Sequence, residues 1–125
     1  MILTLFRDTI DTHIESCNQL KKMEPVITGA GELLFETLEK GGKILICGNG
    51  GSAADAQHFS AEIVGRFEKE RNAWPAVSLT TDTSILTAVA NDYAYDDVFS
   101  RQVRGLGKRG IRSSVSPHPE IQKTF

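Results

Sequence analysis

Residues 43–62 read KILICGNGGSAADAQHFSAE, an apolar run that leads through a glycine-rich turn into a helix-forming segment. The run from Ile44 to Cys47 is short and continuous, which predicts a strand buried on both faces of a parallel sheet. Gly-Asn-Gly-Gly follows at 48–51, and glycines adopt positive φ angles and let a ligand approach the backbone closely. Ser52 is predicted to be the N-cap of the next helix. The N–H groups and the dipole at this helix start suit a phosphate above the turn.

The glycine turn suits a phosphate but does not match the common nucleotide motifs. Its spacing differs from the dinucleotide fingerprint, and no Lys-Ser or Lys-Thr pair follows the glycines, which argues against ATP or GTP. A strand–turn–helix connection without a ligand is the alternative. The side chains of Asn49 and Ser52 add hydrogen-bond donors and favour the ligand site.

His58 and Glu62 are four residues apart and therefore share one face of the predicted helix. Both side chains suit zinc or a related divalent ion, and both could act in acid–base catalysis. An ordinary surface contact is the alternative, and it is the commoner explanation for an isolated pair. Here the pair lies about 10 Å beyond the turn by helix rise, which suits a sugar with its phosphate at the turn. Phe59 and Ile63 are expected to face the core.

The bulk composition is that of one small globular domain. The chain has 125 residues, of which 40% are hydrophobic and 24% charged. A net charge of -2 gives no electrostatic argument for nucleic acid or for an anionic membrane as partner. No apolar run approaches a membrane span, and the N-terminus is too polar for a signal peptide. Cys17 and Cys47 are expected to be free thiols in a reducing cytoplasm.

The rest of the chain alternates helical and strand patterns. Helices are predicted at 2–22, from Pro25 to 41–42, at 52–67, at 83–90 and from Asp96–Asp97 to Gly107, with a second strand at 76–79. This order predicts an α/β fold with a parallel sheet, whose strand C-termini meet at one edge. The charged stretch 68–72 is expected to be a solvated loop or helix end. Side chains expected to be buried on the later helices are Ile85, Leu86, Val89, Val98, Phe99, Val103 and Leu106.

The first predicted helix carries a heptad-like seam. Its members are Leu3, Phe6, Ile10, His13, Cys17 and Leu20, spaced alternately by three and four residues. Such a seam packs either against a partner subunit or against its own domain, and the residues alone leave both open.

Three segments of the chain carry a family resemblance. The segments CGNGGSAADAQHFSAE, LTTDTSILTAVAND and VFSRQVRGLGKRG closely resemble the phosphoheptose isomerases, which contain a sugar-isomerase (SIS) domain. These enzymes interconvert sedoheptulose 7-phosphate and D-glycero-D-manno-heptose 7-phosphate for lipopolysaccharide or surface-glycan precursors. The resemblance covers residues 1–110. It implies a flavodoxin-like fold, a zinc cofactor, a cytoplasmic homotetramer and N-terminal helices at the subunit interface.

The resemblance also implies roles for individual residues. The implied substrate-binding positions are Asn49, Gly50, Gly51, Ser52, Glu62, Asn91 and Asp92, with Ser52 as a phosphate ligand. His58 and Glu62 correspond to two of the four zinc ligands of the family, and Glu62 corresponds to the catalytic base. The chemistry agrees, because a carboxylate can remove a proton next to a carbonyl and a metal can stabilise the ene-diolate.

The tail 111–125 departs from the family pattern. The family continues with a strand, a second phosphate-binding loop, the remaining zinc ligands and a histidine acid. We interpret the tail as out of frame, because one back-translation of 116–124, re-divided after the second base of each codon, reads Ser-Thr-Ser-Gly-Asn-Ser-Lys-Asn, which contains the family's loop. A chain truncated in this way is expected to have a disordered tail, an incomplete SIS domain over 1–110, and impaired or absent activity.

Two other functions remain open at this point. A non-enzymatic SIS module, such as a regulator that associates with the replication initiator DnaA, is one alternative. The glutamate at position 62 favours the enzyme over such a module. A sugar-phosphate sensor or another ketose–aldose isomerase is the second alternative, because the second phosphate loop is absent.

Overall fold

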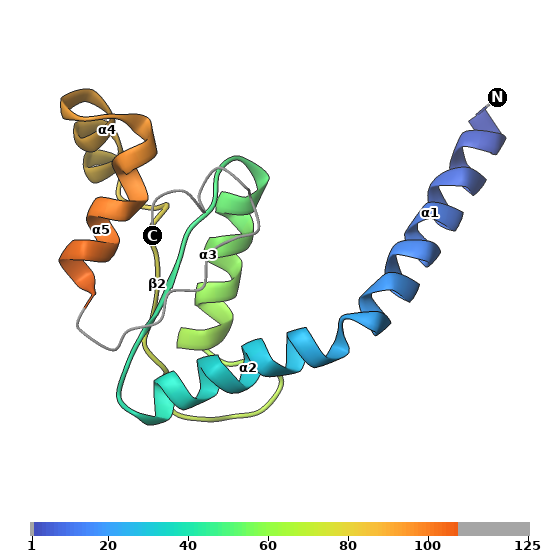
Figure 1. Ribbon diagram of the computed structural model, residues 1–125, viewed down its shortest axis with the longest axis horizontal. Coiled ribbons are helices and arrows are strands. Elements are labelled where there is room, and N and C mark those ends of the chain that lie inside the picture. The colour runs from blue at the N-terminus through green and yellow to red at the C-terminus, as the bar shows by residue number, and fades with distance from the viewer. Residues whose placement is uncertain (1, 108–125) are drawn as a thin grey trace. The chain divides into compact units, whose positions relative to one another are not determined.

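The computed structural model describes residues 2–107, with side chains from Thr4 onward, and it divides the chain into two units at residues 35 and 36. In chain order the elements are α1 (Ile2–Lys22), α2 (Glu24–Glu39), β1 (Ile44–Ile46), α3 (Gly51–Val64), β2 (Ala76–Ser78), α4 (Thr83–Asp92), a 3-10 helix (Tyr95–Asp97) and α5 (Val98–Leu106) (Figure 1). This order confirms the predicted α/β pattern. The predicted tail 111–125 lies outside the described residues.

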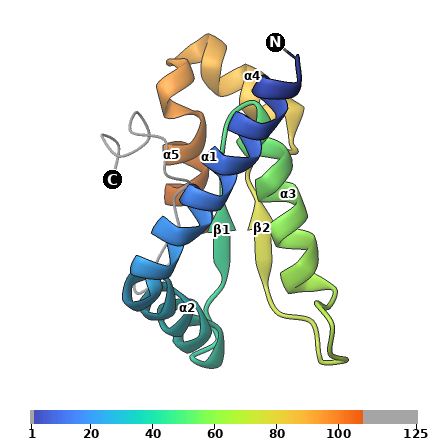
Figure 2. The same ribbon diagram turned by 90° about the vertical axis from the view of Figure 1, so that its right-hand side faces the viewer.

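The sheet of the second unit consists, within residues 2–107, of the parallel strands β1 and β2. Leu45 pairs with Val77, and the ladder is extended by Leu79 N–H, which donates to Ile46 O at 2.8 Å. Figure 2 shows the strands side by side, with α3 next to β2. Because the strands are parallel, their C-termini meet at one edge, as the sequence predicted. The glycine turn and the Thr80–Asp82 loop both leave from this edge.

The core lies between the sheet and the helices α4 and α5. Its buried members are Leu45, Cys47, Leu79, Val98 and Phe99, with Leu86, Val89, Ala90 and Val103 packed against them. The prediction that Ile44 to Cys47 are buried is confirmed. Burial also raises the pKa of the Cys47 thiol, which keeps that thiol protonated at neutral pH. Both cysteines are free, as predicted.

A buried glutamine fastens α5 to the end of β2. Gln102 Nε2 donates to Leu79 O and to Val98 O, both at 3.0 Å. A buried amide without partners would destabilise the fold, so this pairing is required as well as favourable. It holds α5, and the 3-10 helix before it, beside the edge of the sheet from which the glycine turn leaves.

The boundaries of α3 differ from the predicted 52–67. The N-cap is Gly50 rather than Ser52, and its φ of 56° lies in the left-handed region that favours glycine. The chain therefore enters the helix earlier than a serine cap would allow, and Ser52 lies within the first turn. The helix ends at Val64 because Gly65 turns the chain away.

The start of α5 also differs from the prediction. Asp97 is its N-cap residue but makes no side-chain capping hydrogen bond, and Asp96 belongs to the preceding 3-10 helix. The helix therefore starts one residue later than the predicted Asp96–Asp97, and neither aspartate caps it through a side-chain hydrogen bond. The helix Thr83–Asp92 begins with the side chain of Asp82, which accepts from Ile85 N–H at 2.8 Å.

Several side chains that were predicted to be buried are exposed. Phe59, Ile85 and Leu106 are exposed, and Ile63 is half-buried. The reason on α3 is that its small residues, Ala56 and Ser60, face the sheet and allow close packing. Phe59 consequently lies away from the core.

The N-terminal unit contains the predicted helix α1. Phe6, Ile10 and Leu20 are exposed by 66%, 44% and 53%. Between residues 2 and 107, no helix combines the length and apolar character that crossing a bilayer requires.

Candidate functional site

The glycine turn connects β1 to α3 and is shaped by close backbone contacts. A Cβ on Gly48 would lie 2.5 Å from Ser52 O, which is closer than real side chains approach. Ser52 N–H donates to Asn49 O at 3.0 Å, and Ala53 N–H donates to Gly50 O at 3.1 Å. The helix start is therefore tight. N–H groups at a helix start point outward, and the helix dipole favours an anion there.

The structure shows that Tyr95 contacts the glycine turn. Tyr95 Oη donates to Asn49 Oδ1 at 2.9 Å across 46 positions of sequence. Because Oδ1 accepts this hydrogen bond, the Asn49 amide group presents its NH2 end to other partners. The sequence analysis missed Tyr95, since no local pattern links a tyrosine in one segment to a turn in another.

Asn91 and Asp92 form the end of α4 and are exposed. Asn91 Nδ2 donates to Asp92 Oδ1 at 2.9 Å. In the part of the chain described, no hydrogen bond joins either residue to the glycine turn. They lie three or four residues before Tyr95, which does reach the turn.

His58 and Glu62 lie on one face of α3, as their spacing predicted. His58 Nε2 is 3.4 Å from Glu62 Oε1, and the two side chains are exposed by 80% and 35%. Both atoms could therefore approach a common ion. No cluster of three or more histidine, cysteine or acidic side chains suitable for a metal occurs within residues 2–107. The described residues thus fit a metal as a ligand pair, and further ligands would have to come from elsewhere.

A groove of about 580 Å³ runs beside this pair. Its lining combines His58, Glu62 and Arg71 with the aromatic side chains Phe59, Phe67 and Trp74. Ligand pockets in proteins are mostly apolar with a few placed polar groups, and this groove has that composition. Phe59, which is exposed, forms part of the wall of the groove.

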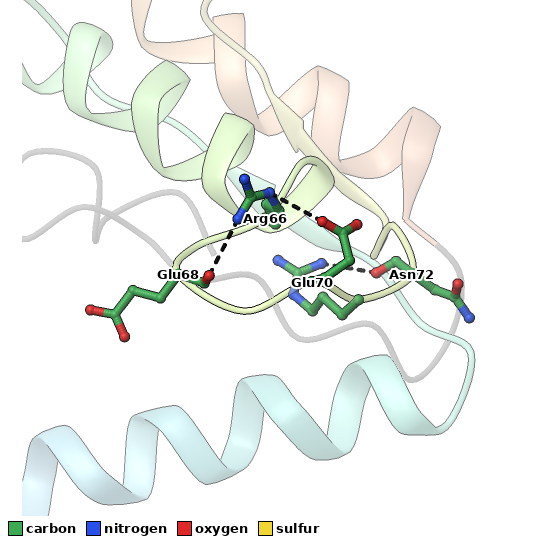
Figure 3. Close-up of polar contacts among 5 residues, drawn as sticks. Arg66, Glu68, Glu70 and Asn72 are labelled. Atoms are coloured by element: carbon green, nitrogen blue, oxygen red, sulfur yellow. Dashed lines mark hydrogen bonds and ion pairs between the residues drawn. The ribbon is translucent and has the colours of Figure 1, made fainter.

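The charged stretch 68–72 after α3 forms a loop, which was one of the two predicted alternatives. Arg66 Nε lies 3.3 Å from Glu70 Oε2, and Arg66 Nη1 donates to Glu68 O at 3.3 Å (Figure 3). Glu68 has a φ of 53°, which is uncommon for a residue with a side chain. These contacts fold the loop back on itself, so that Arg71 is brought to α3.

Comparison with known families matches an SIS domain over residues 9–110. The chain therefore belongs to the SIS-domain family. Its relatives include phosphoheptose isomerases. The enzyme of Campylobacter jejuni is 59% identical over 118 residues, which cover 90% of this chain and 63% of the relative. The enzyme of Helicobacter hepaticus is 49% identical over 107 residues, which cover 86% of this chain and 55% of the relative.

Solved structures agree with this assignment. Phosphoheptose isomerase GmhA from Neisseria gonorrhoeae superimposes with a TM-score of 0.67 at 45% identity, covering 88% of this chain and 58% of that one. A phosphoheptose isomerase from Francisella tularensis gives a TM-score of 0.77 at 37% identity, covering 94% and 65%. The predicted resemblance and fold class are confirmed, and the comparisons favour the isomerase over the DnaA-associated module. The chain spans about half to two thirds of the length of these relatives.

Proposed function

We propose that this protein acts as an aldose–ketose isomerase that converts sedoheptulose 7-phosphate to D-glycero-D-manno-heptose 7-phosphate. The observation that carries the proposal is the placement of the Glu62 carboxylate beside His58, on the helix that starts at the glycine turn. Similarity to the phosphoheptose isomerases supports the choice of substrate. The proposed products are precursors of surface glycans such as lipopolysaccharide, and the free thiols fit a reducing cytoplasm.

The proposed reaction assigns a task to each end of α3. The turn, with Asn49, Ser52 and the N–H groups of Gly50 and Gly51, binds the sugar phosphate. Glu62 removes a proton from C1 of the ketose. The electron pair of that C–H bond forms the C1–C2 double bond, while the π pair of the C2 carbonyl moves onto O2, which gives the ene-diolate. Return of the proton to C2 from the same carboxyl group, with transfer of the O1 hydroxyl proton to O2, restores a carbonyl at C1 and yields the aldose. Asn91 and Asp92 are proposed to contact the sugar hydroxyl groups.

Zinc is the proposed cofactor, and His58 Nε2 and Glu62 Oε1 would hold it. When bound, it would polarise the carbonyl oxygen and stabilise negative charge there. A catalytic zinc site normally has three protein ligands, so this pair alone is expected to bind the ion weakly.

Conversion of sedoheptulose 7-phosphate by the purified, intact protein tests the function directly. We expect the aldose to accumulate slowly in an NMR-monitored reaction, in line with the impaired activity expected of this chain, and fructose 6-phosphate to be converted more slowly still. Binding of the sugar phosphate without conversion would show that the protein is a sugar-phosphate sensor and not an isomerase. Equal turnover of the two ketoses would overturn the substrate assignment.

Tyr95→Phe is expected to weaken binding of the sugar phosphate about 3- to 10-fold, as measured by calorimetry. The substitution removes the hydroxyl that holds Asn49 Oδ1 and so frees the Asn49 amide to rotate. Tyr93→Phe is the matched control, because it removes a hydroxyl nearby while keeping the ring that Arg101 covers. Equal affinities for the two variants would contradict the role given to Tyr95.

A homotetramer assembled through the N-terminal helices is the proposed oligomeric state. The exposed seam of α1 supports it, since an apolar stripe on a helix is typical of helix–helix interfaces. Ile10→Glu is expected to abolish the tetramer at micromolar concentration in light scattering, because it places a charge in the interface. Thr12→Glu introduces the same charge on another face of α1 and is expected to leave the tetramer intact. A tetramer that survives Ile10→Glu would rule out this interface.

A further inference from the structure

Arg71 is the point at which the loop after α3 returns to that helix. Its Nη2 donates to the main-chain oxygen of Glu62 at 2.7 Å, and its Nη1 donates to Asn72 O at 2.9 Å. The guanidinium carbon lies 4.7 Å from the centre of the Trp74 ring. Figure 3 shows the neighbouring loop contacts of Arg66, Glu70 and Asn72. Arg71 is half-buried, so these contacts are partly shielded from water.

The carbonyl that Arg71 binds needs a donor from outside the helix. The last four carbonyls of an α-helix have no intrahelical partner, and α3 ends at Val64. Ala61 O accepts from Gly65 N–H at 2.8 Å, and Ile63 O accepts from Trp74 N–H at 3.4 Å. Glu62 O, between them, is the one that receives a charged side chain. A cation at this end of a helix is also favoured by the helix dipole.

We propose that Arg71 is a positioning residue that holds the main chain of Glu62 and thereby fixes the Glu62 carboxylate beside His58. The inference rests on the proposed function, because it takes Glu62 to be the base. Terminal helical turns fray when their carbonyls are uncapped, and Glu62 lies in the last turn of α3. A misplacement of about 1 Å in a catalytic group can cost about 100-fold in rate.

The contacts of Arg71 require a guanidinium. Its planar fork reaches two carbonyl oxygens while its face stacks on Trp74. A lysine ammonium keeps the charge but has neither the fork nor the flat face. Arg71→Lys therefore separates the contribution of charge from that of geometry, and Arg71→Met removes both while it keeps most of the stem.

The test compares the intact wild-type protein with Arg71→Lys, Arg71→Met and the control Arg101→Met. Arg101 also covers an aromatic ring, because its guanidinium carbon lies 3.9 Å from the centre of the Tyr93 ring. Among the described residues, Arg101 makes no interaction with α3. In Arg71→Met, amide hydrogen exchange over 61–65 is expected to rise about 10-fold, and kcat to fall about 10- to 100-fold with KM nearly unchanged. Arg71→Lys is expected to be intermediate, and Arg101→Met to match wild type.

Three outcomes would overturn the proposal. Unchanged exchange over 61–65 in Arg71→Met would show that Arg71 does not hold this turn. Faster exchange with unchanged kcat would show a purely structural role. If the wild type does not convert the sugar, the proposed function fails. The zinc affinities of the wild type and of Arg71→Met then test whether Arg71 positions Glu62. An affinity weakened about 10-fold in Arg71→Met supports positioning of Glu62, whereas an unchanged affinity overturns it.

Discussion

Replacing Glu62 by glutamine is expected to lower kcat for isomerisation of sedoheptulose 7-phosphate by about 100- to 10,000-fold. The amide has the shape of the carboxylate but cannot accept the proton from the sugar carbon. KM is expected to change little, since we propose that the phosphate binds at the glycine turn, at the other end of α3. Initial rates over a range of substrate concentrations separate kcat from KM.

The control for this experiment is Glu39→Gln. Glu39 is an exposed glutamate at the end of α2, and its replacement makes the same change of charge away from the groove. We expect it to retain the wild-type rate. Turnover that survives Glu62→Gln would show that another group is the base, and the assignment of Glu62 would have to be abandoned.

Gly48→Ala is expected to lower the free energy of unfolding by about 1–3 kcal/mol and to abolish phosphate binding at the turn. The added Cβ would meet Ser52 O at 2.5 Å, Ser52 C at 2.7 Å and Ser52 Cβ at 2.8 Å. Two of these atoms belong to the backbone at the start of α3. The clash is therefore relieved only by moving the helix start, and with it the N–H groups proposed to bind the phosphate.

Urea unfolding and calorimetry with inorganic phosphate measure the two effects of Gly48→Ala. Gly51→Ala is the control for stability, because a Cβ at that position meets no atom within 4 Å and its φ is not positive. An alanine there is expected to leave the unfolding midpoint unchanged or slightly higher. A Gly48→Ala variant as stable as Gly51→Ala would show that the turn adapts to the side chain.

The helices and strands that could be predicted are those that local sequence patterns determine. The apolar run 44–47 predicted the buried strand, and the heptad spacing predicted α1. The predicted boundaries of α3 were wrong at both ends. At the start of the helix, a cap by Ser52 competes with a cap by Gly50, which has a positive φ. Local preference favours serine, but the close approach of Gly48 to Ser52 settles where the helix begins.

The candidate site shows the same division. His58 and Glu62 were predicted to be neighbours because a helix brings positions four apart together. Tyr95 and Arg71 were missed, since their contacts with Asn49 and Glu62 depend on how loops return to the sheet edge and to α3. Phe59 was misassigned to the core, although it is apolar, because smaller residues occupy the face of α3 toward the sheet.

The sequence alone therefore established the family, the order of helices and strands, and the side chains that meet within a single helix. These properties follow from short-range periodicity and from motifs of a few residues, which remain the same whatever the rest of the chain does. The folded arrangement established which apolar residues are exposed, which glycine starts α3, and which distant side chains hold Asn49 and Glu62. Such contacts join positions that are up to 46 residues apart. They form only when the chain between these positions closes into a loop, which costs conformational entropy, so no local pattern can encode them.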